Sequence, residues 1–137
     1  MLARREHSRT ELERKLAVRG FPQPLIGEIL DTLENENLLS DLRFTESYVV
    51  HRTGRGQGPL KIRYELRERG VSDDLVAQSS DTDRQSCCER ALAVRLKRFG
   101  PERPQDIRER SRQSRFLVQR GFEQDHIRYA LDSNDIS

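Results

Sequence analysis

The chain has 137 residues, of which 34% are apolar and 35% are charged, and its net charge at pH 7 is +2. So small an apolar share excludes one large hydrophobic core and favours thin helical layers that each bury one stripe. No run approaches the roughly 18 apolar residues of a membrane span, and no apolar signal segment opens the chain, so we expect a cytoplasmic protein without a membrane partner.

The N-terminal third predicts three helices. The first is expected over about residues 2–19, or from a cap at Ser8 whose capping box Glu11 completes. Gly20 then ends it, and a second helix follows with a wide apolar stripe over 25–33. Ser40 or Asp41 can cap the third helix, whose buried face we expect to be Phe44, Tyr48 and Val49.

A glycine-rich loop, Thr-Gly-Arg-Gly-Gln-Gly-Pro, occupies residues 53–59. It lacks the Gly-Lys-Ser/Thr ending of a phosphate-binding loop, and no apolar strand precedes it. We therefore interpret it as a hinge between repeats rather than a nucleotide site.

Five more helices are expected after this loop. The fourth begins at Pro59, and a short, weakly apolar fifth follows Ser72. The sixth spans about 83–99 and the seventh about 105–120, with Ile107, Phe116 and Leu117 expected as its buried anchors. The eighth begins near residue 123. No stretch alternates with period two for long enough to be a strand, so the predicted fold class is all-α.

An Arg-Gly turn recurs three times, with its glycines at 20, 70 and 121, and a leucine stands four residues before each glycine. A period of about 50 residues with matched apolar positions is typical of stacked repeats. We expect an elongated array of tandem three-helix repeats over 1–53, 54–100 and 101–137, the last short and incomplete with two helices. Gly20, Gly70 and Gly121, together with Gly58, Asp41 and Phe44, are expected to have structural roles as turns, a cap and a core ring.

Charge alternates in step with this repeat. The segments before each Arg-Gly turn, residues 1–20, 51–70 and 90–120, carry net charges of +3, +4 and +7, whereas the segments after them carry −5, −4 and −3. If the basic helices align, they form a stripe suited to a polyanion or an acidic protein surface.

Residues for catalysis or metal binding do not cluster. The three histidines are scattered, Cys87 and Cys88 are adjacent and unsuited to bridging each other, and the densest acids, 73–74 and 81–83, resemble helix caps in a serine-rich stretch. We expect no metal, no cofactor and no enzymatic activity.

Several short motifs cover nearly the whole chain, from about residue 4 to 131. They are Arg5-Glu-His-Ser8-Arg-Thr-Glu11-Leu12, Lys15-Leu16, Gly20-Phe21, Asp41-Leu-Arg-Phe44, Tyr48-Val49, Gly58-Pro59, Ile62, Leu66, Gly70-Val71, Phe116-Leu117-Val-Gln-Arg120-Gly121-Phe122 and Ile127. In order and spacing these motifs resemble those of the RecX family of regulatory proteins.

The resemblance implies a curved row of three-helix repeats and a modulator of the RecA recombinase. Such proteins bind the filament of RecA on single-stranded DNA, restrain its growth, and thereby dampen recombination, DNA repair and the SOS response. RecA and single-stranded DNA are then the expected partners of a monomer, and double-stranded DNA is left open. The chain departs from the family in having no third helix after its last Arg-Gly turn.

The residues expected to contact RecA or DNA are cations of the basic segments, namely Arg52, Arg55, Lys61, Arg63, Arg67, Arg112 and Arg115. The alternative is a non-specific DNA-binding helical module that acts without RecA. Sequence-specific reading is disfavoured, because the helices after the turns, where a recognition helix would lie, are acidic.

Overall fold

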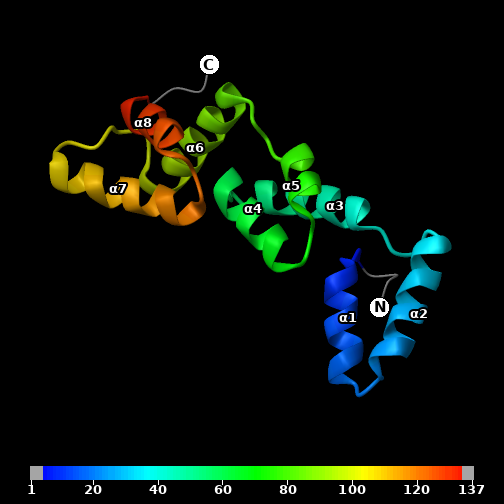
Figure 1. Cartoon of the computed structure of the whole chain (residues 1–137). Helices are drawn as coiled ribbons and strands as arrows, with labels where there is room; N and C mark the ends of the chain where they lie inside the picture. Colours follow the sequence, from blue (N-terminus) through cyan, green and yellow to red (C-terminus); the bar gives the residue numbers. More distant parts are fainter. Residues whose placement is uncertain (1–4, 134–137) are drawn as a thin grey trace. The chain divides into compact units, whose positions relative to one another are not determined.

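The computed structural model describes residues 5–133, and every regular element within this range is an α-helix (Figure 1). This confirms the predicted all-α class. No helix in the described range is long and apolar enough to cross a bilayer. The helices are α1 (Arg9–Val18), α2 (Gln23–Asn35), α3 (Asp41–Gly54), α4 (Pro59–Glu68), α5 (Asp73–Ser79), α6 (Arg84–Phe99), α7 (Ile107–Arg120) and α8 (Gln124–Asp132).

Polar caps determine where the helices begin. The Ser8 hydroxyl accepts from the Glu11 backbone N–H at 3.1 Å, and the Glu11 carboxylate accepts from the Ser8 N–H, so the capping box starts α1 at Arg9. An earlier start near Leu2 falls on residues 1–4, which lie outside the described range. The carboxylates of Asp83 and Asp106 cap α6 and α7, since each accepts a hydrogen bond from the backbone N–H three residues further on.

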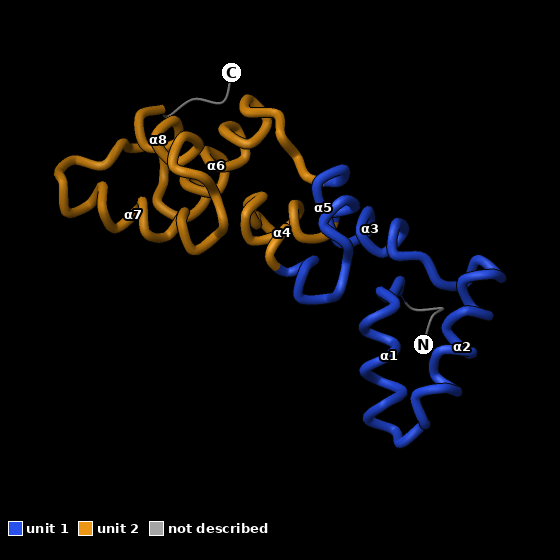
Figure 2. Tube along the Cα trace, viewed as in Figure 1, with its two compact units in different colours: residues 1–50, 65–79 blue, residues 51–64, 80–137 orange. Residues whose placement is uncertain are grey.

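The chain forms two compact units, and along the sequence it passes from one to the other within α3, within α4 and after α5 (Figure 2). Unit 1 comprises residues 1–50 and 65–79. Leu12 of α1 and Ile26 and Leu30 of α2 form its main apolar cluster. Asp41 does more than begin α3, because its carboxylate accepts from the Arg9 backbone N–H at 2.8 Å.

Unit 2 comprises residues 51–64 and 80–137, and its core lies between α6, α7 and α8. Ala91 and Leu92 of α6 pack against Leu117 of α7 and against the apolar face of α8. Cys87 and Cys88 are both buried and unbridged, and burial raises the pKa of the Cys87 thiol to about 11. Both cysteines therefore belong to the packed interior of α6.

One expected anchor is also misplaced. Ile107 is 83% exposed at the first position of α7, one turn before Arg110, which pairs with Asp132 at the end of α8. Gln113, which breaks the apolar pattern of the repeat, is nevertheless buried on that same helix. Helical spacing identifies the face of α7 but not how far along it the packing extends.

Two of the three Arg-Gly turns receive the first turn of another helix. In unit 2, the Gly58 N–H donates to the Arg120 carbonyl at 2.6 Å, and the Leu60 N–H donates to the Gly121 carbonyl at 2.9 Å. In unit 1, the Ser8 hydroxyl donates to the Arg69 carbonyl at 2.7 Å. Carbonyls at one helix end thus bind donors at the start of another, which satisfies groups that neither helix pairs internally.

Only glycine permits these approaches. A Cβ on Gly58 would lie 2.5 Å from the Gly121 carbonyl carbon, and a Cβ on Gly121 would lie 2.7 Å from the Lys61 backbone nitrogen. A Cβ on Gly70 would collide with Thr10. Gly20 also has a positive φ, +90°, but no atom of the described residues lies within 4 Å of its Cβ position.

Alanine substitution at these turns separates backbone strain from the helix contact. Because Gly20 and Gly121 both have positive φ, alanine costs about 1 kcal/mol of strain at either. At Gly121 the clash with Lys61 adds about 2 kcal/mol of overpacking. We expect Gly121→Ala to lower the free energy of unfolding by about 3 kcal/mol and Gly20→Ala by about 1, measured by urea unfolding with amide hydrogen exchange to report each unit separately. Equal losses would show that the contact contributes nothing.

Candidate anion-binding site

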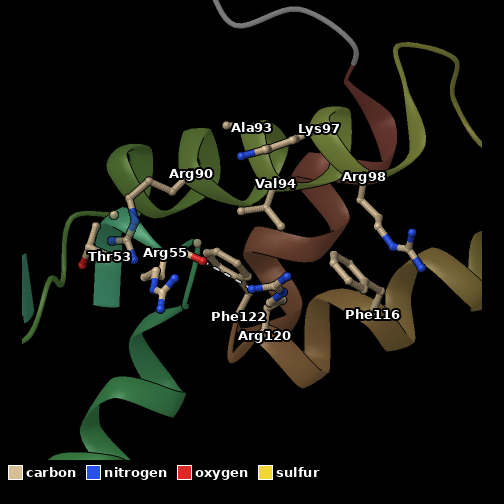
Figure 3. A pocket seen from close by; sticks show the side chains of 12 residues that line it. Thr53, Arg55, Arg90, Ala93, Val94, Lys97, Arg98, Phe116, Arg120 and Phe122 are labelled. Carbon is tan, nitrogen blue, oxygen red and sulfur yellow. Dashed lines mark hydrogen bonds between the residues drawn. The ribbon is translucent and has the colours of Figure 1, made fainter. Parts of the chain in front are cut away.

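A cavity of about 620 Å³ lies in unit 2, between the end of α3 with the loop that follows, one face of α6, and the C-terminal half of α7 (Figure 3). We refer to it as the basic pocket. Its lining residues are Thr53, Gly54, Arg55, Gly56, Arg90, Ala93, Val94, Lys97, Arg98, Phe116, Arg120 and Phe122.

Helical spacing brings the pocket side chains of α6 to one face. Arg90, Val94, Lys97 and Arg98 stand at positions i, i+4, i+7 and i+8, which share one side of a helix. The opposite side of α6 packs into the core of unit 2. Because α6 is anchored by that apolar face, its basic face is held toward the loop and α7.

The loop wall is positioned by the glycine contact. The two hydrogen bonds from Gly58 and Leu60 to the turn after α7 hold residues 54–56 beside the C-terminal half of α7. Gly56 has a φ of +83°, and its Cβ position lies 3.3 Å from a Val94 methyl group, so the loop follows the surface of α6 closely.

Five of the twelve lining residues are cationic and none is acidic. Arg90 donates to the Asp81 carboxylate and to the Gln57 carbonyl, both at 2.9 Å. Within residues 5–133, no carboxylate forms an ion pair with the other four cations, which are Arg55, Lys97, Arg98 and Arg120. The pocket therefore carries uncompensated positive charge.

Among the described residues, the carboxylate that pairs with a pocket cation is that of Asp81, which pairs with Arg90. Burial alone would raise the pKa of this carboxyl, but hydrogen bonds from the Asp83 backbone N–H, the Ser86 hydroxyl and Arg90 outweigh it. Its pKa consequently lies below the ordinary 3.8. The ion pair with Arg90 is complete at neutral pH.

An aromatic ring separates two of the guanidinium groups. Arg98 and Arg120 lie over the Phe116 ring at 5.5 and 5.1 Å from its centroid (Figure 3). Phe99 meets the same ring edge-on, with the two ring centroids 5.3 Å apart. The Arg120 guanidinium also donates to the Arg55 carbonyl at 3.3 Å. Ring and backbone thus fix cations that would otherwise be mobile on the surface.

This arrangement can bind an anion with planar or apolar groups attached. Its lining offers guanidinium and ammonium donors beside Val94, Phe116 and Phe122. It contains neither a carboxylate nor a histidine to serve as a general base, and across the described residues no three His, Cys, Asp or Glu side chains are grouped to hold a metal ion.

Of the seven expected contact residues, the structure places Arg55 in the basic pocket. Arg115 lines a separate hollow between α7 and α8, and Lys61 lines a third beside the Gly121 turn. Arg52, at the end of α3, is half-buried. The seven are therefore not gathered at one site.

The remaining expected contact residues already have partners. Arg63 donates to the Ser80 hydroxyl at 3.1 Å, and Arg67 pairs with Asp73 at 3.2 Å. Arg112 pairs with Glu109 at 2.9 Å and lies over the Phe99 ring. Their role in contacting RecA or DNA stays a prediction.

Four cations of the basic pocket are not among the residues expected from the sequence, namely Arg90, Lys97, Arg98 and Arg120. A signal was present, because residues 90–120 have the highest net charge of any segment and three of the four share one face of α6. Most of the expected residues lie instead on α4 and α7, the helices that precede the second and third Arg-Gly turns.

Comparison with known proteins bears on the whole chain. Models for the first, second and third three-helix domains of RecX match residues 1–33, 40–79 and 86–131. The regulatory protein RecX of Halorhodospira halophila is 44% identical over 98% of this chain and 84% of its own length. That of Pseudomonas putida is 43% identical over 99% of this chain and 87% of its own. The crystal structure of RecX from Lactobacillus salivarius superimposes with a TM-score of 0.77 at 22% identity, over 96% of this chain and 87% of that one, which shows a shared fold.

The matched domains group the helices differently from the expected repeats. They place α3, α4 and α5 in one domain and α6, α7 and α8 in the next, whereas the expected boundaries fall at 53/54 and 100/101. In the matched grouping each Arg-Gly turn joins the last two helices of a domain, and α6 is the further helix that accompanies α7 and α8. The expected division stays a prediction.

Asp81→Asn tests the charge balance of the basic pocket. Removing this carboxylate leaves Arg90 uncompensated, so we expect the affinity for heparin to rise about threefold and the free energy of unfolding at pH 7 to fall by about 1 kcal/mol. Because the folded-state pKa is lowered, the stabilisation is present above pH 3.8 and is lost as the pH falls below it, so the stability difference should shrink in acid. Heparin affinity chromatography and urea unfolding at two pH values measure both effects. Weaker retention of the variant on the heparin column would contradict the view that Asp81 compensates the charge of Arg90.

Proposed function

Because the chain belongs to the RecX family of regulatory proteins, we propose that it binds the filament of RecA on single-stranded DNA and inhibits its growth and activities. The observation that carries this proposal is the ordered match of three RecX domains, together with more than 40% identity to curated relatives over nearly the whole chain. The protein would then act in the cytoplasm as a negative modulator of recombination, DNA repair and the SOS response.

The basic pocket supports this proposal physically. The DNA strand of such a filament is a polyanion, and a concave surface with four unpaired cations attracts one more strongly than a flat, neutralised helix face does. Two compact units in one chain can also engage a polymer at more than one point, so that individually weak contacts combine into tight binding.

Inhibition follows if a bound molecule occupies surface that an incoming RecA subunit needs. No chemistry is required of the inhibitor in this scheme. The naming of the curated relatives as regulatory proteins supports the expectation that the chain is not an enzyme. A monomer is sufficient for inhibition of this kind.

The second candidate is a non-specific DNA-binding module that acts without RecA. The same unpaired cations favour it, because phosphate contacts alone give non-specific affinity. The two candidates differ in whether RecA activity changes when the protein is present in amounts too small to coat the DNA.

We expect the protein to inhibit ATP hydrolysis by RecA on single-stranded DNA at substoichiometric amounts. The double variant Lys97→Glu/Arg98→Glu should need at least a tenfold higher concentration for the same inhibition, because it reverses two exposed pocket charges. Arg108→Glu/Arg128→Glu, which makes the same change of net charge at exposed positions outside the pocket, is the matched control.

Steady-state ATPase rates at fixed RecA and DNA measure both comparisons. An unchanged rate at one inhibitor per RecA would contradict the proposed function. Equal loss of inhibition in the two double variants would mean that net charge, rather than the basic pocket, is responsible.

A further inference from the structure

We propose that the basic pocket holds one unstacked nucleotide of a single DNA strand, with its phosphate on the side of Arg55 and Lys97 and its base against the group formed by Arg98, Phe116 and Arg120. The choice of DNA rests on the proposed function. The mode of binding rests on the pocket itself.

The apolar wall favours a nucleotide over an acidic peptide. Carboxylates of a peptide would be satisfied by the cations alone, and they gain nothing from Val94, Phe116 and Phe122. A nucleotide uses both halves of the lining, because its phosphate takes the charge-assisted hydrogen bonds and its base takes the ring and the guanidinium planes. Arginine planes and phenylalanine rings are the surfaces on which unpaired bases stack in nucleic-acid-binding proteins.

The guanidinium groups beside Phe116 are already ordered before any strand binds. Phe116 itself is half-buried and braced edge-on by Phe99, and Arg120 is tied to the loop through the Arg55 carbonyl. A base that enters therefore meets a fixed surface and costs little side-chain entropy. Arg98 is exposed while its guanidinium lies over Phe116, so a base can stack on its outer side.

The shape selects a single strand. A volume of about 620 Å³ lies in the range of sites that enclose small ligands, so the pocket fits a nucleotide and not a duplex. A paired base has neighbours on both faces and must leave its stack to enter, which costs a few kcal/mol that an unpaired base does not pay.

The pocket should also tolerate any base. Its side chains include one neutral hydrogen-bonding group, Thr53, and no amide or carboxylate that could accept from the amino groups of adenine or cytosine. Stacking serves all four bases, since each has a π-face. A regulator that follows a filament of arbitrary sequence needs this tolerance.

The test uses the full chain without RecA. Fluorescence anisotropy measures its affinity for a labelled thymidine oligomer and for an abasic strand of equal length and charge. We expect the thymidine strand to bind at least fivefold more tightly, and Phe116→Leu, which keeps an apolar side chain, to abolish that preference while abasic binding stays unchanged. Arg98→Gln should reduce the preference for the thymidine strand, because Arg98 lies on the base side. Lys97→Gln, an exposed position on the phosphate side, should instead lower the salt dependence of binding by about 0.7 in log–log slope, one phosphate contact on a single strand. Arg108→Gln, exposed and outside the pocket, is the control for both variants.

A direct measurement complements the variants. A strand carrying 5-iodouracil should photocrosslink wild-type protein at Phe116 or Phe122, identified by peptide mass spectrometry, and a duplex of the same sequence should not. Equal binding of thymidine and abasic strands, or crosslinks only outside the pocket, would overturn the proposal. If pocket variants lose RecA inhibition but bind both strands as wild type does, the pocket takes an acidic protein surface instead. If the base preference holds but RecA is not inhibited, the proposed function fails and the nucleotide site remains.

Discussion

The arrangement of unit 2 depends on one contact, in which the start of α4 approaches the turn after α7 to a distance that only glycine allows. Gly58 and Gly121 face each other without side chains, and backbone donors at one helix start meet carbonyls at the other helix end. The contact satisfies polar groups that helix termini leave free, and it does so without apolar area. It also fixes the loop at 54–56 beside α7, which creates the basic pocket.

A chain with so few apolar residues uses polar groups for packing elsewhere too. Arg95 is fully buried in α6, and its guanidinium donates to the carbonyls of Ala130, Glu102 and Ser133 at 2.7 to 3.0 Å. Burial, and the nearby charge of Arg103 to a lesser degree, lowers its pKa. Three carbonyls, two of them at the end of α8 where the helix dipole is negative, compensate that buried charge. Arg95 thereby anchors the inner face of α6 and leaves Lys97 and Arg98 on the outer one.

Local chemistry made much of the fold predictable. Ser8 with Glu11, the proline at 59 and the Arg-Gly turns each act over a few residues, so their signals identified helix starts and ends from sequence. The pocket was not predictable by the same means. It depends on which face of α6 packs against α8 and on the contact between Gly58 and Gly121, residues 63 apart in sequence. Ile107 was misassigned for the same reason, because periodicity does not show where a neighbouring helix stops.

Family membership and the unpaired cations together support a regulator that acts by occupying a RecA filament. The most direct measurement is the growth rate of single filaments of fluorescent RecA on single-stranded DNA. We expect wild-type protein to slow extension in proportion to its concentration and Lys97→Glu/Arg98→Glu to slow it far less. Filaments that grow at the same rate with and without the wild-type protein would contradict it.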